Sequence, residues 1–384
     1  MDKIKTCKYI VALIRALLKN EKPMEKPDDI SFEDIYQMAK YHQVLSMCLF
    51  AIEKLDHKPE AEIMQAWEKR RLLSTVQSSV QLSERDKILH SFHDNEIRCL
   101  PLKGCLMKEM YPKPEYREMS DLDLLLDTDC FEKAESILEN LGYEVDHASA
   151  VHENYRKQPF MNVELHFSLF SEGFMKAHNA LNDKQNIMLN PWVHAHETEL
   201  KHIYQFSWED FYIYMFLHLV KHLESAGIGI RQFIDLWVFR QNHELDNNYL
   251  QDTFDQFGLL QLYLDIEDLV SVWMSCGQTP KELIELESYV FDAGVYGTYT
   301  NKITNRIVLN ERATNGKLSA ISYLMRRTFI PLKTMKRIYP ILNKYPVLLP
   351  GMWAHRIFTK FIHRDSHALK EFKMFKEYYK NKSE

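Results

Sequence analysis

Two aspartates one residue apart, Asp121 and Asp123, lie in the segment SDLDLLL, where they alternate with leucines. Side chains two positions apart on a β-strand point to the same face of the sheet. The alternation therefore predicts a strand with a leucine face toward the core and two carboxylates on the exposed face. Two negative charges so close repel each other unless a cation lies between them, and Mg²⁺ prefers such oxygen ligands. The alternative interpretation is an edge strand with two solvated acids.

The segments that flank this strand carry further residues suited to phosphate and metal chemistry. Lys103 and Gly104 end a short apolar run that is predicted to be a strand, and the glycine lets the backbone approach a ligand closely. A helix is predicted to begin at Cys105, and its N-terminal amides would favour phosphate oxygens. Arg117 and Ser120 come shortly before the aspartates. A later alternating run, FMNVELH, carries a third carboxylate, Glu164. This order of apolar and acidic segments predicts a small α/β sheet with three acids on neighbouring strands.

The region from Leu102 to His166 resembles the nucleotidyltransferase superfamily that includes DNA polymerase beta. Within it, the chain is most similar to an uncharacterised bacterial branch, whose members are called simply nucleotidyltransferase family proteins. The resemblance depends on a Lys-Gly pair, an arginine before an Asp-x-Asp strand, a later Glu-x-His strand and polar residues in a following helical region. The corresponding residues here are Lys103, Gly104, Arg117, Asp121, Asp123, Glu164, His166, His218, His222, Arg231 and Asp235.

The resemblance implies an enzyme that moves a nucleoside monophosphate from a nucleoside triphosphate to an acceptor hydroxyl. Its cofactors would be two Mg²⁺ ions about 3.5–4 Å apart, with Mn²⁺ as a substitute. The implied catalytic and metal-binding residues are Asp121, Asp123 and Glu164. The implied nucleotide-binding residues are Lys103, Gly104, Arg117, Ser120 and Arg231. The residues implied to contact and orient these groups, without touching the metal or the nucleotide, are His166, His218, His222 and Asp235.

Several of these residues also have a structural interpretation. Arg117 can form a surface ion pair with a neighbouring glutamate, and Lys103 can be a solvated lysine. Arg231 and Asp235 are four residues apart, so they can pair along one helix. His166 can be a structural histidine that is fully hydrogen-bonded.

Two other functions stay open beside nucleotidyl transfer. The wider superfamily usually has glycine or serine after the glycine of the turn, whereas Cys105 follows Gly104 here. This difference favours a nucleotide-binding or regulatory protein without catalysis. The third hypothesis is a phosphotransferase that moves the terminal phosphate with the same metal-binding residues.

The composition predicts a folded protein, mostly helical and of the α+β class. Hydrophobic residues make up 46% of the 384 residues, and only 11 glycines and 13 prolines are present. We expect a small mixed β-sheet, the nucleotidyltransferase core, flanked by helical regions. The predicted division is an N-terminal helical region at 1–95, the core at 96–205, a helical domain at 206–325 and a basic helical tail at 326–384. The longer predicted helices span 4–18, 31–55, 61–92 and 131–141.

Charge and cysteine content limit the partners and the location of the protein. The net charge of −6 argues against a polynucleotide polymerase, so no nucleic acid is expected as a partner. The expected partners are a nucleoside triphosphate and an acceptor that is a small molecule, a glycan or a protein. Six cysteines without CxxC spacing indicate neither a zinc site nor a disulfide framework. No signal peptide and no membrane-spanning stretch is predicted, so a cytoplasmic bacterial protein is expected.

Overall fold

The computed structural model describes residues 2–148, 152–180, 186–225, 227–294 and, near the C-terminus, 332, 335, 339 and 341–362. The chain divides into two compact units, residues 1–223 with 227–296, and residues 224–226 with 297–384. The N-terminal helices, the sheet and the second group of helices thus share one unit. The predicted basic tail belongs to the other unit and lies mostly outside the described residues. Its described helices are α16 (Ile341–Lys344) and α17 (Leu349–Ile362).

The fold is α+β and mostly helical, as predicted, with a mixed five-stranded sheet in the order β1-β2-β5-β4-β3. The strands are β1 (Cys99–Pro101), β2 (Leu122–Leu126), β3 (Glu144–Ala148), β4 (His152–Lys157) and β5 (Met161–His166). The central strand β2 pairs antiparallel with β1 and parallel with β5. The sequence did not predict β4, which lies between β3 and β5. A separate hairpin joins β6 (Ala195–Glu197) to β7 (Tyr204–Phe206).

Strand β2 is buried on both faces, which corrects one prediction. Leu122, Leu124 and Leu126 pack into one hydrophobic cluster, whereas Leu125 packs into another on the opposite face. The predicted exposed face is therefore wrong for Asp123, which is only 2% exposed. A strand covered on both sides by helices reads as a nearly continuous apolar run, and LLL at the end of β2 belongs to that pattern.

The N-terminal helices are α1 (Lys3–Leu18), α2 (Phe32–Tyr41), α3 (Leu45–Ile52) and α4 (Ala61–Asp94). Ser31 caps α2 as expected, because its side chain accepts a hydrogen bond from the amide of Asp34. The single helix predicted for 31–55 is two helices. They are separated where Gln43 adopts a left-handed conformation with φ of 52°.

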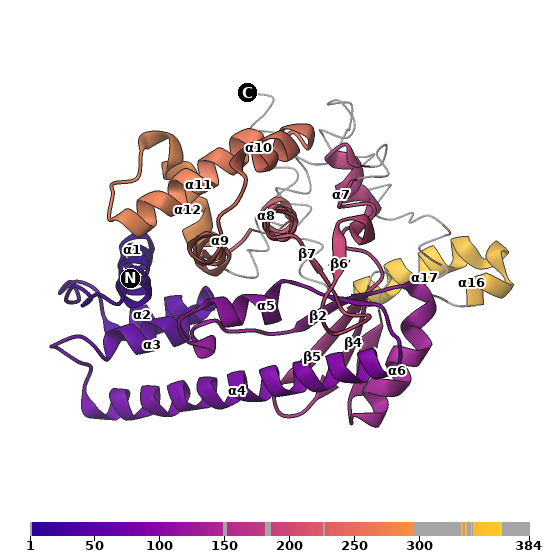
Figure 1. Cartoon of the computed structure of the whole chain (residues 1–384), viewed down its shortest axis with the longest axis horizontal. Coiled ribbons are helices and arrows are strands. Elements are labelled where there is room, and N and C mark those ends of the chain that lie inside the picture. The colour runs from indigo at the N-terminus through magenta and orange to yellow at the C-terminus, as the bar shows by residue number, and fades with distance from the viewer. Residues whose placement is uncertain are drawn as a thin grey trace. The chain divides into compact units, whose positions relative to one another are not determined.

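Helices cover the face of β2 that carries Asp123. The remaining helices of this unit are α5 (Lys103–Met110), α6 (Phe131–Asn140), α7 (Glu172–Ala177), α8 (Trp208–Ser225), α9 (Ile230–Asn242), α10 (Asn247–Gln256), α11 (Leu260–Ser275) and α12 (Ile284–Ala293). Figure 1 shows α5 between the long helix α4 and the pair α8 and α9. Among the described helices, none has both the length and the apolar character needed to cross a bilayer.

Candidate active site

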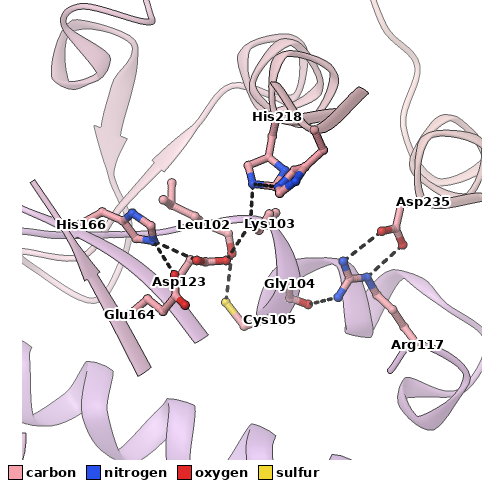
Figure 2. Close-up of polar contacts among 11 residues, drawn as sticks. Leu102, Lys103, Gly104, Cys105, Arg117, Asp123, Glu164, His166, His218 and Asp235 are labelled. Atoms are coloured by element: carbon pink, nitrogen blue, oxygen red, sulfur yellow. Dashed lines mark hydrogen bonds and ion pairs between the residues drawn. The ribbon is translucent and has the colours of Figure 1, made fainter. Parts of the chain in front are cut away.

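The parallel pairing of β2 with β5 brings two carboxylates and an imidazole together. Asp123 lies opposite Glu164 in the register, and Leu125 lies opposite His166. His166 Nε2 is 2.8 Å from Asp123 Oδ1 and 3.6 Å from Glu164 Oε2 (Figure 2). One ligand atom from each of these three residues falls within 4.8 Å of the other two. This group can therefore hold a metal ion.

The chemistry of this group fits a divalent cation. Asp123 is buried, and its Oδ2 receives no hydrogen bond, although Lys103 Nζ lies 3.1 Å away. A buried carboxylate oxygen without a hydrogen bond destabilises the fold unless another positive group compensates. Carboxylates suit Mg²⁺ and Mn²⁺, and an imidazole nitrogen suits transition metals. Asp123, Glu164 and His166 thus offer suitable donors for a cation, next to a lysine that already compensates the charge of Asp123.

The three predicted acids interact electrostatically, although they differ in environment. Burial alone would raise the pKa of Asp123, but Lys103 and the hydrogen bond from His166 hold this pKa well below its usual range. Burial and the charge of Asp123 raise the pKa of Glu164. The same two causes raise the pKa of Asp121. Asp121 precedes β2 and stands outside the group of three. Asp123 is thus held ionised, whereas Glu164 and Asp121 take up protons more readily than ordinary carboxylates.

Lys103 connects this cluster to helix α8. Its ammonium lies 3.1 Å from Asp123 Oδ2 and 2.8 Å from His218 Nε2. Burial and Lys103 lower the pKa of His218 well below its usual range, so His218 is neutral and its Nε2 accepts a hydrogen bond from the ammonium of Lys103. His222 Nε2 lies 3.3 Å from His218 Nε2, and burial lowers the pKa of His222 to about 3. The two histidines therefore hold Lys103 in place as neutral groups.

Arg117 braces the site instead of extending toward solvent. Its Nε and Nη2 donate to the two carboxylate oxygens of Asp235 at 2.9 Å each, and its Nη1 donates to the carbonyl of Gly104 at 3.2 Å. The hydroxyl of Tyr111 also donates to Asp235, at 2.7 Å. The sequence interpretation as a surface ion pair with a glutamate is wrong, because Arg117 is buried and pairs with α9. Each of its three guanidinium nitrogens therefore donates to a protein acceptor.

A cavity of about 140 Å³ is lined by Asp121 and Lys103; we call it the active-site cavity. Asp123, Glu164 and His166 are not among its lining residues, and Lys103 connects it to Asp123. The predicted site residues that line it are Lys103, Gly104, Arg117, Ser120, Asp121, His218, His222, Arg231 and Asp235. Arg231 does not pair with Asp235 along α9. Its Nη1 donates to Gln43 and to the carbonyl of Glu118, while its buried Nε has no hydrogen-bond partner. Lys103 and Arg231 are therefore the cations best placed to meet an anionic ligand in this cavity.

Gly104 lies in the first turn of α5 and not in a loop before it. A side chain here would meet Met119 at 3.3 Å and the carbonyl oxygen of Asp121 at 3.4 Å. The glycine thus lets the segment before β2 pass close to α5, which sets the position of Asp121.

Gln43 also lines the active-site cavity, yet no sequence signal indicated it, because only the tertiary fold brings the loop between α2 and α3 to this place.

These features define a protein that can hold a divalent cation next to a basic cavity, an arrangement that phosphoryl-group transfer requires. A family model described as an uncharacterised nucleotidyltransferase matches residues 28–275. The match covers more than half of the chain and includes every residue of the site, so the protein belongs to this nucleotidyltransferase family. No curated protein and no solved structure was found to match the chain.

Proposed function

We propose that this protein is a nucleotidyltransferase that depends on a divalent cation and moves a nucleoside monophosphate from a nucleoside triphosphate to an acceptor hydroxyl. The observation that carries this proposal is the pairing of β2 with β5, which places Asp123, Glu164 and His166 within 4.8 Å of one another. Lys103 lies beside this group and lines the active-site cavity, and Arg231 lines the same cavity, so both can meet a triphosphate bound there. Membership of a nucleotidyltransferase family supports a nucleoside triphosphate as the substrate.

In the proposed reaction the acceptor oxygen forms a bond to the α-phosphorus, and the bond from that phosphorus to the bridging oxygen breaks. Pyrophosphate leaves with the electron pair. Asp123, Glu164 and His166 would hold Mg²⁺ or Mn²⁺, which supplies charge stabilisation and lowers the pKa of the acceptor hydroxyl. We assign Asp121, which lines the cavity, as a further ligand that completes the predicted two-ion site. Asp121 is also the carboxylate to which we assign the hydroxyl proton.

Two cations of the protein take the role of phosphate contacts in this proposal. Lys103 reaches both the acidic cluster and the active-site cavity, so its ammonium can neutralise charge on the triphosphate. Arg231 presents an unpartnered Nε at the same cavity, and its guanidinium suits the oxygens of the pyrophosphate leaving group. Ser120 lines the cavity and can donate its hydroxyl to a phosphate oxygen.

Arg117 has a positioning role in this proposal. The ion pair with Asp235 fixes the segment from Arg117 to Asp121 against α9, and the bond to Gly104 fixes it against α5. Neutral His218 and His222 have a related role, because they hold Lys103 without adding positive charge. A rigid arrangement of this kind is what electrostatic stabilisation of a transition state requires.

The test is incubation of the protein with Mg²⁺, a bacterial extract as the source of acceptors, and a nucleoside triphosphate that carries ³²P at either the α or the γ position. Label from the α position in an acceptor is the expected result, and Asp123→Asn should abolish it. The matched control is Asp252→Asn, at an exposed position of α10, which should transfer label as the wild type does. Transfer from the γ position would indicate a phosphotransferase, and nucleotide binding without transfer would indicate a regulatory protein.

A further inference from the structure

A second cavity of about 140 Å³ lies between α4 and the segment that leads into β2; we call it the α4 cavity. Every lining residue except Met119 carries a charged, amide or hydroxyl group. It shares Gln43, Arg117, Met119 and Ser120 with the active-site cavity. Ser120 directly precedes Asp121 in the chain. The two cavities therefore adjoin next to the candidate active site.

The α4 cavity is lined by buried polar groups with unused hydrogen-bonding capacity. Gln81 is 2% exposed, and its Nε2 donates to the carbonyls of Met119 and Phe160, while its Oε1 has no partner. Lys108 is also 2% exposed, and its Nζ donates to the carbonyl of Arg117 at 2.8 Å. Among the described residues, no carboxylate forms an ion pair with Lys108. Buried polar groups are normally satisfied, so the unpartnered Oε1 of Gln81 indicates a place for a polar ligand, and the ammonium of Lys108 has further protons to donate there.

The charges around the α4 cavity favour a neutral ligand. Arg70 is positively charged, whereas Glu115 and Glu118 are negatively charged; burial and the charge of Arg117 lower the pKa of Lys108 to about 7, so Lys108 adds at most one further positive charge and the lining has no net positive charge for an anion. The charge of Arg117 is already matched by Asp235. A net charge on the ligand would leave one of these groups without compensation in a partly buried place. A hydrogen-bonding ligand without charge is the better fit.

Hydroxyl groups match the unused groups of this cavity in chemistry, and the cavity has room for a small ligand. A hydroxyl donates and accepts at once, so neighbouring hydroxyls can donate to Gln81 Oε1 and accept from Lys108. No aromatic ring lines the cavity, so a flat apolar ligand has no surface against which to stack. The volume of about 140 Å³ is enough for a small molecule with several hydroxyl groups.

We propose that the α4 cavity binds a small neutral polyol, one hydroxyl of which is the acceptor of the nucleotidyl group. The binding step stands on the cavity alone, whereas the transfer step rests on the proposed function. In the transfer step the polyol oxygen bonds to the α-phosphorus, pyrophosphate leaves with the electron pair, and the hydroxyl proton passes to Asp121. The product is a phosphodiester between the polyol and the nucleoside.

Ser74 offers a variant that fills the cavity without removing a tertiary contact. It is buried, it lines the α4 cavity, and its hydroxyl donates only to the carbonyl of Arg70 in its own helix, at 3.2 Å. Ser74→Leu therefore places a branched apolar side chain in the cavity. Ser79→Leu makes the same exchange at an exposed position of α4 and is the matched control.

The experiment measures binding of glycerol, ribitol, myo-inositol and glucose by ligand-observed NMR, and then their labelling from an α-³²P nucleoside triphosphate. We expect at least one polyol to bind the wild type and Ser79→Leu, and to bind Ser74→Leu at least tenfold more weakly. The bound polyol should be labelled by the wild type. Ser74→Leu should lose this labelling but keep the slow hydrolysis of the nucleotide by water.

Failure of this proposal can be distinguished from failure of the proposed function. Equal binding by Ser74→Leu, or no binding of any of the four polyols to the wild type, would overturn the assignment of the cavity. Nucleotide hydrolysis together with polyol binding but without polyol labelling would overturn the acceptor assignment. Polyol binding that Ser74→Leu weakens, in a protein that turns over no nucleotide, would support the cavity and contradict the proposed function.

Discussion

Removal of the Arg117 guanidinium should strongly destabilise the protein, because Asp235 would then carry a buried charge without its partner. The variant Arg117→Met keeps most of the side-chain length and removes all three of its hydrogen bonds to protein acceptors. The side chains of Arg117 and Asp235 are only 5% and 6% exposed, so water cannot replace the lost interaction. Tyr111 would remain as a donor to Asp235, at 2.7 Å.

The expected magnitude follows from the burial of this ion pair. Removal of one partner of a buried pair typically lowers the free energy of unfolding by ~3–5 kcal/mol. The double variant Arg117→Met/Asp235→Leu removes both charges, so its loss should be smaller than the two single losses added together, by about 2–3 kcal/mol. Removal of the guanidinium should also displace the segment that leads to Asp121, so we expect Arg117→Met to have a lower rate of nucleotidyl transfer.

The assay is urea unfolding of the single and double variants, followed by far-UV circular dichroism. The control is Lys22→Met, which removes an ion pair with Asp56. The side chains of Lys22 and Asp56 are 60% and 67% exposed. This control should leave the unfolding midpoint unchanged, because exposed pairs contribute little. A loss below about 1 kcal/mol for Arg117→Met, or simple addition of the two single losses, would refute the reasoning.

Three further predictions concern the metal site, the phosphate contacts and pH. His166→Ala should weaken Mn²⁺ binding by at least about tenfold in calorimetry, and unchanged binding would exclude the imidazole as a ligand. Arg231→Met should raise KM for the nucleoside triphosphate about tenfold, because this factor corresponds to the loss of one hydrogen bond to a charged group. An unchanged KM would exclude Arg231 as a phosphate contact. Burial lowers the pKa of His42 from 6.5 to about 4. Between pH 6.5 and pH 4, His42 therefore binds a proton in the unfolded chain but not in the folded protein. The free energy of unfolding is thus unaffected by His42 above pH 6.5 and decreases as the pH falls toward 4. Urea unfolding should show a loss of ~3 kcal/mol over this range that His42→Gln lacks, and parallel curves for the two proteins would contradict the prediction.

Elements with a strong local pattern could be predicted from the sequence. The predicted helices 4–18 and 131–141 correspond closely to α1 and α6, because their apolar spacing is visible within the segment itself. Strand β4, with the sequence HENYRK, has no such pattern, and its place depends on pairing with β3 and β5. The break between α2 and α3 carries neither glycine nor proline, since Gln43 adopts the left-handed conformation there.

The acidic cluster could be predicted in part. Asp123 and Glu164 were expected on neighbouring strands, and the register confirms that they lie opposite each other. His166 was expected behind them, whereas its Nε2 is one of the three candidate ligand atoms. The partner of Arg117 could not be predicted, because α9 follows in the chain more than a hundred residues later and only the tertiary fold brings Asp235 to it. Burial of such a pair is a property of the packed helices and not of any local motif.

The most direct test of nucleotidyl transfer at Asp123 needs no knowledge of the acceptor, because water can replace it slowly. Phosphorus NMR would follow a nucleoside triphosphate incubated with Mg²⁺ and either the wild type or Asp123→Asn. Cleavage between the α- and β-phosphates should appear with the wild type, as nucleoside monophosphate and pyrophosphate, and should be absent with Asp123→Asn. Formation of nucleoside diphosphate and inorganic phosphate, or equal cleavage by the variant, would contradict the proposed function.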